Sequence, residues 1–471
     1  MISSGDNNPL RRSIEGGEKY IFKPIVKVSP LIMEQGAASI DIICEYSNGG
    51  KVKQNNSTHS LHLYNSTEYE SIYNPYAPVA ESGPLDAASN MFYGHKDYIS
   101  GIVSAIMDSA SKQVIIYGQK RSGKSSVLNR VKQELENAGA FCVLFSMGKI
   151  VRKISEFSFY YKILKTIKDE LFLLTMDGKN VPEFSIPTKN EFIAEDEENP
   201  VETFSKYMQM FKLACRKTSG WENRRLVVMI DEFTYMYGAI KMNSISNTIM
   251  QQWKAVTQDP LTQFSAVLVG QDVVPAFKNE PYARNPFGVI EDLRLTYLDP
   301  ADAKKLIVNP INNNESRYVG GAADLIMDYT ACNPYYIQIF CASLVDYINE
   351  KKYKSITEAD VTDVANRLTS GVYALDHAKF ENLLNARETE EESIEDGSEI
   401  DEAIMVYNDD DVETVLRAIA KASENKPFAN RSDIKTNLDP DVEDGIIKQL
   451  YSRDVIDQKE KYQDEISHKE K

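Results

Sequence analysis

The feature that most constrains this chain is a glycine-rich octapeptide between an apolar run and a helical pattern. Residues 118–125 read GQKRSGKS and fit the pattern G-x-x-x-x-G-K-[ST]. The preceding residues, Gln113–Tyr117, predict a short strand, and apolar residues recur at helical spacing over residues 125–138. A strand, a glycine loop and a helix in this order predict a phosphate-binding loop, because the glycines let consecutive backbone N–H groups turn towards an anion.

Each part of this loop has an expected role in holding a nucleotide. Lys124 is expected to reach the β- and γ-phosphates, and Ser125 to ligate Mg²⁺. Gly118 and Gly123 permit the tight turn, and the helix that follows adds its positive end. ATP and Mg²⁺ are therefore the expected cofactors. The predicted phosphate-binding residues are Gly118, Gln119, Lys120, Arg121, Ser122, Gly123, Lys124, Ser125 and Ser126.

A second apolar run ends in two carboxylates. Residues 225–230 predict a buried strand, and Asp231 and Glu232 follow it directly. The carboxyl end of a central parallel strand lies at the ligand edge of a sheet. We therefore expect Asp231 to hold Mg²⁺, directly or through water, and Glu232 to polarise the attacking water. Such a pair alone is more often a solvated turn, so the prediction depends on the glycine loop about a hundred residues earlier.

Alternating strands and helices predict an α/β phosphate-loop fold with a parallel sheet covered on both faces. Further strands are expected at residues 140–145 and 264–269, and within 289–298. The first and last modules of the chain are expected to be incomplete. The predicted order is a β-rich N-terminal module (1–75), a linker (76–90), the α/β domain (91–300), a helical lid (301–372), an acidic linker (373–411) and a winged-helix domain (412–471).

Smaller elements are predicted outside the sheet. Residues 176–200 are expected to be an exposed insertion. Three strands are expected in the N-terminal module, at residues 20–29, 39–46 and 60–64. Four lid helices are expected at residues 301–308, 322–329, 335–350 and 357–368. The winged helix is expected to have helices at residues 412–422, 431–436 and 441–453, then a strand at 455–461.

Charge limits the partners that the chain can have. The formal net charge is −17, and residues 388–411 hold twelve carboxylates and no Lys or Arg. This excludes a general polyanion binder. The candidate recognition helix carries Asp441, Glu443 and Asp444 in its first turn, where they would repel a duplex. DNA is therefore not an expected partner.

Cysteine usage and hydropathy point to a reducing compartment. The five cysteines are scattered, odd in number and without a C-x-x-C pair, which argues against disulfides and a zinc site. No apolar run approaches the roughly 20 residues of a membrane helix, and the N-terminus lacks a signal-like apolar region. We expect a cytoplasmic protein without a membrane partner.

Together these features resemble the AAA+ and STAND group of P-loop ATPases over about residues 90–471. The resemblance rests on the glycine loop, the strand ending in Asp-Glu, the later run FSAVLVGQD (264–272) and the lid turn Cys332-Asn333-Pro334-Tyr335. It implies ATP bound between the sheet and the lid. Two turns would embrace the adenine: one containing Gly94 and His95, and one containing Pro334. His95 stands where the family usually has Arg.

The same resemblance implies two further residue roles. Gln271, after the fourth strand, would be the polar sensor, with Asp272 as a competing neighbour. Arg284, or else Arg294, would supply an arginine finger to an adjacent subunit. No lid arginine facing the γ-phosphate is evident near Pro334, and this departure favours the STAND subtype.

The implied function is an ATP-binding and ATP-hydrolysing molecular switch in signalling or conflict response. It would act as a homo-oligomer or by an intramolecular switch, with a protein trigger and effector that the sequence does not identify. One alternative is an ATP-gated DNA-binding initiator or transcription regulator of the archaeal type. A non-hydrolysing ATP-binding scaffold is a third reading, against which the intact Lys124, Asp231 and Glu232 argue.

Overall fold

The chain divides into two compact units, each built from segments far apart in sequence. The hairpin–lid unit combines Met1–Ser82 with Asp299–Leu375, and the sheet unit combines Gly83–Leu298 with Asp376–Lys471. Of the 471 residues, the computed structural model describes 29, 31–32, 37–48, 51–62, 69–81, 83–149, 154–196, 199–241, 243–271, 290–312, 317–370, 373–384, 407–423, 429–453 and 455–456.

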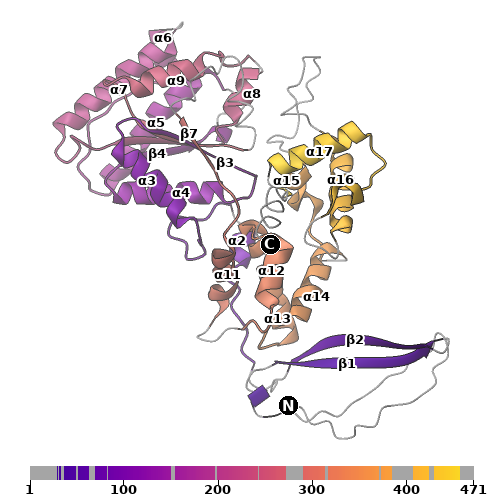
Figure 1. The fold of residues 1–471 in the computed structure, drawn as a ribbon. Coiled ribbons are helices and arrows are strands. Elements are labelled where there is room, and N and C mark those ends of the chain that lie inside the picture. Colours follow the sequence, from indigo (N-terminus) through magenta and orange to yellow (C-terminus); the bar gives the residue numbers. More distant parts are fainter. Residues whose placement is uncertain are drawn as a thin grey trace, which may run out of the picture. The chain divides into compact units, whose positions relative to one another are not determined.

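A five-stranded parallel sheet forms the centre of the sheet unit (Figure 1). Every neighbouring pair of its strands is parallel. Because one strand separates β3 from β5, the carboxyl ends of those two strands lie near each other at one edge. In spatial order the strands are β4 (Phe141–Ser146), β5 (Leu226–Asp231), β6 (Ser265–Val269), β3 (Gln113–Tyr117) and β7 (Ile290–Arg294).

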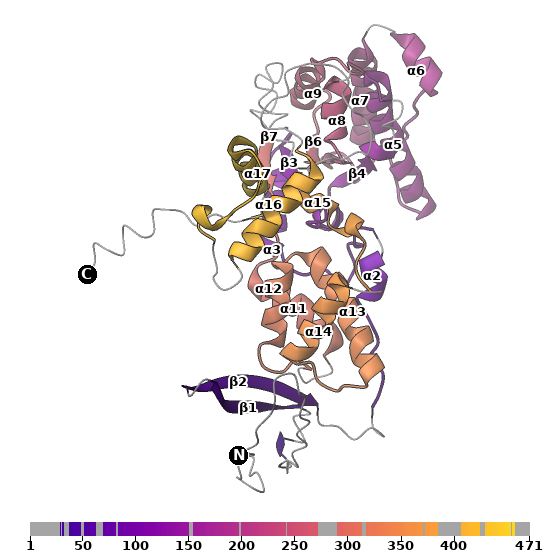
Figure 2. The ribbon, with the colours of Figure 1, turned by 90° about the vertical axis from the view of Figure 1, so that its right-hand side faces the viewer.

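Helices bury both faces of this sheet (Figures 1 and 2). Along β5, Val228 and Ile230 pack into one hydrophobic cluster, and Val227 and Met229 into another, since successive side chains point to opposite faces. The first cluster includes residues of α5 (Glu156–Met176), α7 (Pro200–Lys217), α8 (Tyr235–Lys241) and α9 (Ile249–Gln258). The second includes residues of α3 (Lys96–Asp108) and α4 (Lys124–Asn137).

The predicted α/β class and its parallel sheet are confirmed. Strands β3, β4, β5 and β6 begin and end within one residue of the predicted positions, and β7 falls inside the predicted interval. Strands β3, β4, β5 and β6 could be predicted because a strand covered on both faces carries a nearly continuous apolar run, whereas β7 has the mixed sequence IEDLR.

The insertion predicted at residues 176–200 is exposed over much of its length but contains a buried aromatic anchor. A short helix, α6 (Lys189–Glu195), forms there and buries Phe192 completely. The Thr188 side chain accepts from the Glu191 backbone N–H, and Glu191 accepts from Thr188 in return. This capping box starts the helix, and a single buried aromatic ring docks it.

The C-terminal segment of the sheet unit is only partly a winged helix. The first and third predicted helices are confirmed as α16 (Asp409–Ala422) and α17 (Pro440–Ser452). The second is a three-residue 3₁₀ turn, η9 (Arg431–Asp433). Of the predicted strand at 455–461, residues 455 and 456 form a bend and the others lie outside the described residues. A small core joins these elements to α15 (Glu381–Leu384), with Leu384, Val412, Val415, Ile446 and Leu450 at its centre.

In its described residues, the hairpin–lid unit joins a two-stranded hairpin to the short helix α2 (Ala77–Glu81) and four lid helices. Strands β1 (Ala37–Asn48) and β2 (Lys51–His62) are antiparallel, with Asn48 opposite Lys51. Most of β2 was missed because its sequence, KVKQNNSTHSLH, is polar and lacks an apolar face. The predicted strand at 20–29 lies outside the described residues except for residue 29, which is not in a strand. The lid helices match: α11 (Pro300–Val308), α12 (Ala322–Thr330), α13 (Pro334–Lys351) and α14 (Glu358–Thr369).

Residues at the boundary between the predicted N-terminal module and the predicted linker are bonded to the lid helices. The fully buried Tyr76 hydroxyl donates to the Ile307 carbonyl at 2.6 Å, in the last turn of α11. The Asn349 side chain on α13 pairs with both backbone groups of Ile72. The short helix α2 (Ala77–Glu81) follows Tyr76. This segment therefore belongs to the same folded body as the lid.

Within the described ranges, every helix is too short or too polar to cross a bilayer.

Candidate nucleotide-binding site

The glycine loop turns tightly between β3 and α4, as its sequence predicts. Gly123 caps α4 with a left-handed φ of 95°, and Arg121 is also left-handed, at 68°. A Cβ atom on Gly118 would lie 2.5 Å from the Leu295 carbonyl oxygen, so only glycine fits beside the end of β7. Non-helical residues followed by a helix start give a ring of backbone N–H groups suited to an anion.

Lys124 points back into its own loop. Its ammonium group donates to the backbone carbonyls of Gly118, at 2.8 Å, and Gln119, at 2.5 Å. Both acceptors belong to the turn that would surround a phosphate. The charge of Lys124 is therefore held at the place where the prediction needs it, by weak acceptors that a phosphate oxygen could replace.

Asp231 meets the loop from the end of β5. Its carboxylate accepts a hydrogen bond from the Ser125 hydroxyl, and Lys124 is close enough to stabilise its charge. Burial dominates nevertheless and raises the pKa of Asp231 above its ordinary value. The structure thus brings Lys124, Ser125 and Asp231 together at the carboxyl ends of β3 and β5.

Glu232 is held in a strained backbone conformation, with a φ of 56°. One carboxylate oxygen, Oε2, accepts from the Ser146 hydroxyl and from the Gly148 backbone N–H, the latter at 3.2 Å. A Cβ atom on Gly148 would lie 2.5 Å from the same oxygen, so a larger residue there would displace the Glu232 carboxylate from its present position. The other oxygen, Oε1, has no hydrogen-bond partner among the described residues.

Ser146 and Gly148 were not predicted as site residues. The signal for Ser146 was present, because it ends an apolar strand, β4, that is parallel to β5. Ser146 lies opposite Asp231 in the register of that pair. Carboxyl ends of parallel strands meet at one edge, so a polar residue at such an end is a candidate partner.

Side chains of the glycine loop also contact the C-terminal segment of the sheet unit. The Gln119 amide, which is 4% exposed, donates to the carbonyl of Arg453, just after α17, and accepts from the Tyr297 hydroxyl. The Arg121 guanidinium donates to the carbonyl of Lys379. These hydrogen bonds connect the conformation of the glycine loop directly to the elements that follow residue 376.

The remaining loop residues differ in environment. The Lys120 side chain is exposed. The Ser122 hydroxyl is buried and lacks a hydrogen-bond partner within the described ranges, as a group awaiting a ligand would. The Ser126 hydroxyl accepts from the Leu85 backbone N–H at 2.9 Å, which gives it a structural role.

The residues assigned through the resemblance come from different parts of the chain. Gly94 and His95 form a left-handed turn before α3 in the sheet unit, whereas Pro334 starts α13 in the hairpin–lid unit. Gln271 follows β6 and is half-buried. Arg284 and Asp272 lie outside the described residues, and Arg294 lies on β7 opposite Tyr117. Their roles stay predictions.

The described part of the chain contains no cluster of three or more His, Cys, Asp and Glu side chains that could hold a metal. Ser125 and Asp231 do fit Mg²⁺, because they offer two neighbouring oxygen ligands and a buried carboxylate that needs a counter-charge. Such a site would be completed by phosphate oxygens.

Comparison with known proteins gave matches only among solved structures. No protein-family model matches the chain, and no curated protein matches it significantly. The Aeropyrum pernix ORC2 protein (ADPNP–ADP complexes) is 12% identical over 80% of this chain and 89% of that chain, with a TM-score of 0.46.

Two further structures are similar. A Drosophila ORC chain from a complex with DNA is 10% identical over 86% of this chain and 85% of that one, with a TM-score of 0.41. The Thermotoga maritima RuvB Holliday junction branch migration motor is 12% identical over 62% and 75%, with a TM-score of 0.35. At these scores the likenesses carry no functional inference. The parallel sheet, with a glycine loop after β3, gives the chain the fold of an α/β P-loop NTPase.

Proposed function

We propose that the chain binds ATP with Mg²⁺, hydrolyses it and works as a nucleotide-driven molecular switch. One observation carries this proposal: Ser125 donates to Asp231 at one sheet edge, the charge of Lys124 acts on the same carboxylate, and Glu232 lies directly beside Asp231. Phosphoryl transfer to water requires a loop that holds phosphate, a cation, two oxygen ligands for the metal and a carboxylate that activates water.

Nucleotide binding would exchange internal hydrogen bonds for bonds to phosphate. Lys124 would leave the carbonyls of Gly118 and Gln119 for the β- and γ-phosphate oxygens, which carry full charge. The buried Ser122 hydroxyl and the N-terminus of α4 would add donors. The loop thus offers cationic and dipolar groups whose own partners are weaker than a phosphate.

Mg²⁺ would be held by Ser125 and Asp231, and when bound it would neutralise charge on the phosphate oxygens. Its charge would also remove the cost of ionised Asp231, whose pKa burial raises. Glu232 would then act on water. Its Oε2 is fixed by Ser146 and Gly148, so Oε1 is the oxygen available to accept a water proton.

The switch is supported by contacts between the glycine loop and the C-terminal elements. A phosphate entering the loop would displace Lys124 beside Gln119, whose amide contacts Arg453. Arg121, two residues on, contacts Lys379. An intramolecular route from nucleotide to C-terminal segment follows. A STAND-type role in signalling or conflict response, a protein trigger and effector, and homo-oligomer formation remain proposals from the resemblance.

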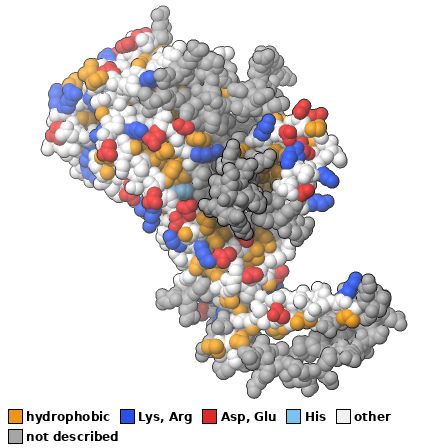
Figure 3. Space-filling model, in the orientation of Figure 1, with side chains coloured by type: hydrophobic (Ala, Val, Ile, Leu, Met, Phe, Trp, Pro, Cys, Tyr) orange, Lys and Arg blue, Asp and Glu red, His pale blue; other side chains and the backbone are white. Residues whose placement is uncertain are grey.

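A second candidate function is ATP-gated DNA binding. It is supported by the environment of the carboxylates on α17. Glu443 does not face outward as the sequence pattern suggested; it is 7% exposed and bonds to Thr436 and Arg431. Asp444 also pairs with Arg431, at 2.6 Å. Two of the three carboxylates expected to repel a duplex are therefore compensated within the chain. Against DNA, the face in Figure 3 shows interspersed positive and negative side chains rather than a positive stripe.

A salt titration separates the two functions. Fluorescence anisotropy of a random 30-base-pair duplex, on the order of one site plus flanks, would be measured with the full chain, with and without ATP. The switch proposal expects no micromolar binding at physiological salt. Micromolar binding that depends on ATP and weakens steeply with salt would promote the DNA candidate.

The proposed activity is tested by phosphate release from ATP. The full chain should release phosphate only when Mg²⁺ is present, and Glu232→Gln should abolish most of that release. Glu202→Gln, an exposed carboxylate change on α7, serves as the matched control and should keep the wild-type rate. Equal rates in all three proteins would refute the assignment of Glu232.

A further inference from the structure

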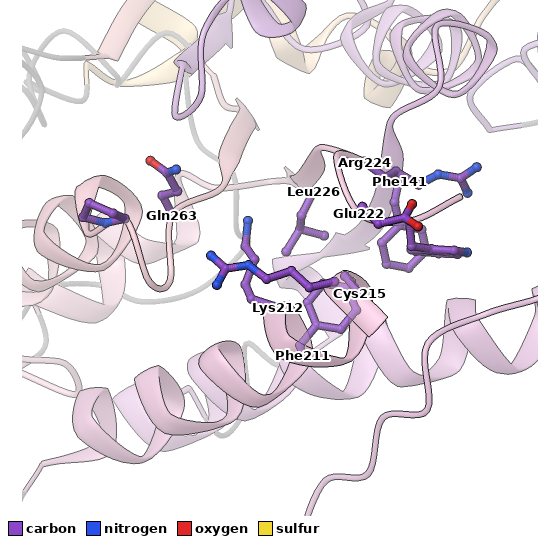
Figure 4. Close-up of a pocket in the computed structure, with 11 residues that line it drawn as sticks. Phe141, Phe211, Lys212, Cys215, Glu222, Arg224, Leu226 and Gln263 are labelled. Carbon is purple, nitrogen blue, oxygen red and sulfur yellow. The ribbon is translucent and has the colours of Figure 1, made fainter. Parts of the chain in front are cut away.

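A second cavity lies at the opposite end of the sheet from the glycine loop. It is lined by the first residues of β4 and β5, the end of α7, and the turns before β5 and β6 (Figure 4). Its volume is about 120 Å³. The lining residues are Phe141, Phe211, Lys212, Cys215, Arg216, Trp221, Glu222, Arg224, Leu226, Pro260 and Gln263. Amino ends of strands gather here, so the nucleotide assignment does not account for it.

Positive charge dominates this cavity, with three cationic side chains against one carboxylate. None of Lys212, Arg216 and Arg224 has a carboxylate partner within salt-bridge distance in the described part of the chain. The single carboxylate, Glu222, accepts from the Gly220 backbone N–H at 2.9 Å. Arg216 and Arg224 are exposed, whereas Lys212 is half-buried, and an unpaired cation that is partly buried is costly unless an anion joins it.

Lys212 is the innermost cation. Its side chain extends towards Gln263 and Leu226 (Figure 4), and the residue is half-buried. Burial, together with the nearby charges of Arg216 and Arg225, lowers the pKa of Lys212. A buried ammonium group without a counter-ion has this property, and a bound anion would reverse it.

Aromatic rings form one part of the mainly polar cavity wall. Phe141 and Trp221 pack edge to face with ring centroids 5.0 Å apart. The Arg224 guanidinium lies over the Trp221 ring at 4.5 Å, and the indole N–H donates to the Asn180 carbonyl at 2.8 Å. The Trp221 ring thus orients Arg224 before any ligand arrives.

We propose that this cavity binds a phosphate group. Three cations suit a dianion better than a singly charged carboxylate, and guanidinium groups offer paired donors to phosphate oxygens. The Gln263 amide adds a neutral donor. The volume is below the roughly 300–1,000 Å³ of pockets that enclose whole small molecules. The cavity therefore admits one phosphate, free or at the end of a larger molecule that remains outside.

Helix α7 supplies a matched control. Arg216 and Lys217 are neighbours in its last turn, where either cation would stabilise the helix dipole. Only Arg216 lines the cavity. A role limited to the helix end would make the two residues equivalent, whereas a phosphate site would make them different.

The test is calorimetric titration of inorganic phosphate into the full chain carrying Lys124→Ala, which removes the lysine of the glycine loop. We expect millimolar binding that Lys212→Gln or Arg216→Gln weakens about tenfold or more, while Lys217→Gln changes it less than about twofold. Arg216 is exposed, so its variant keeps the test valid if Lys212→Gln fails to fold. Because Lys124 is absent throughout, the result is independent of the proposed ATPase activity.

A 5′-phosphorylated dinucleotide and its unphosphorylated form identify the source of the phosphate. Tighter binding of the phosphorylated form than of free phosphate supports a terminal phosphate, and equal binding supports a small phosphate ion. Equal losses in Arg216→Gln and Lys217→Gln would overturn the proposal. So would the absence of phosphate binding, including the case in which a glutamate-rich peptide binds instead.

Discussion

The two edges of the central sheet handle charge in opposite ways. At the carboxyl edge, Lys124 is bonded to backbone carbonyls, Asp231 to Ser125 and Glu232 to Ser146. At the amino edge, Lys212 and Arg216 have no carboxylate partner among the described residues. A ligand at the carboxyl edge must displace internal bonds, and this couples binding to movement. A ligand at the amino edge would meet cations that have no internal carboxylate partner to displace.

The largest effect is expected at Glu232, because it acts on the reacting water. Glu232→Gln removes the proton acceptor but keeps the bonds to Asp231 and a similar volume. We expect the hydrolysis rate to fall by about 10²-fold or more, with ATP affinity little changed. Single-turnover hydrolysis together with calorimetry separates the two quantities. Loss of binding instead would mean that the roles of Asp231 and Glu232 are exchanged.

Next in size is the loss of the Lys124 charge. Lys124→Ala should weaken ATP·Mg²⁺ binding by about 2–3 kcal/mol, or roughly 30–150-fold, since a charge-assisted contact to phosphate disappears. Lys120→Ala is the control, because that exposed side chain lies in the same loop and its backbone N–H is kept. Calorimetry in which the two variants lose equal affinity would speak against a specific role for Lys124.

A smaller effect is expected at Ser146, which positions Glu232. Ser146→Ala leaves only the Gly148 N–H as a donor to Oε2, so the Glu232 carboxylate should be less well oriented. We expect kcat to fall by roughly 2–10-fold at unchanged KM. Ser146→Thr, which keeps the hydroxyl, should recover most of the rate. A shift confined to KM would show that Ser146 affects binding rather than orientation of the base.

The smallest effect concerns stability without ligand. Burial raises the folded-state pKa of Asp231, so its ionised form destabilises the fold above that pKa, and the cost disappears as pH falls below the unfolded value. Asp231→Asn should therefore raise the melting temperature at neutral pH by about 1–3 °C, the scale of a sub-kcal/mol change in such a domain. The gain should shrink as pH is lowered. A lower melting temperature at pH 7 would contradict the assigned cost.

The sequence was informative where a local pattern determines the structure. Four of the five strands are nearly continuous apolar runs, and the glycine loop is a contiguous motif, so both could be predicted. Strand β2 and helix α6 were missed because a polar hairpin strand and a helix docked by Phe192 leave weak periodic signals.

Contacts between residues far apart in the sequence could not be predicted from local sequence patterns. The bonds from Gln119 to Arg453 and from Arg121 to Lys379 join residues more than 250 positions apart. The cavity around Lys212 is likewise assembled from α7 and the starts of β4 and β5. The Glu443 side chain is buried by its bonds to Thr436 and Arg431. A prediction from sequence charge alone therefore overestimated the negative charge exposed on α17.

The most direct test of the nucleotide assignment is a crystal structure of the full chain with a non-hydrolysable ATP analogue and Mg²⁺. The account predicts phosphates enclosed by residues 118–125, with Lys124 Nζ moved from the Gly118 and Gln119 carbonyls to the β- and γ-phosphate oxygens. An analogue bound elsewhere, or a nucleotide in the loop with Lys124 still on those carbonyls, would contradict it.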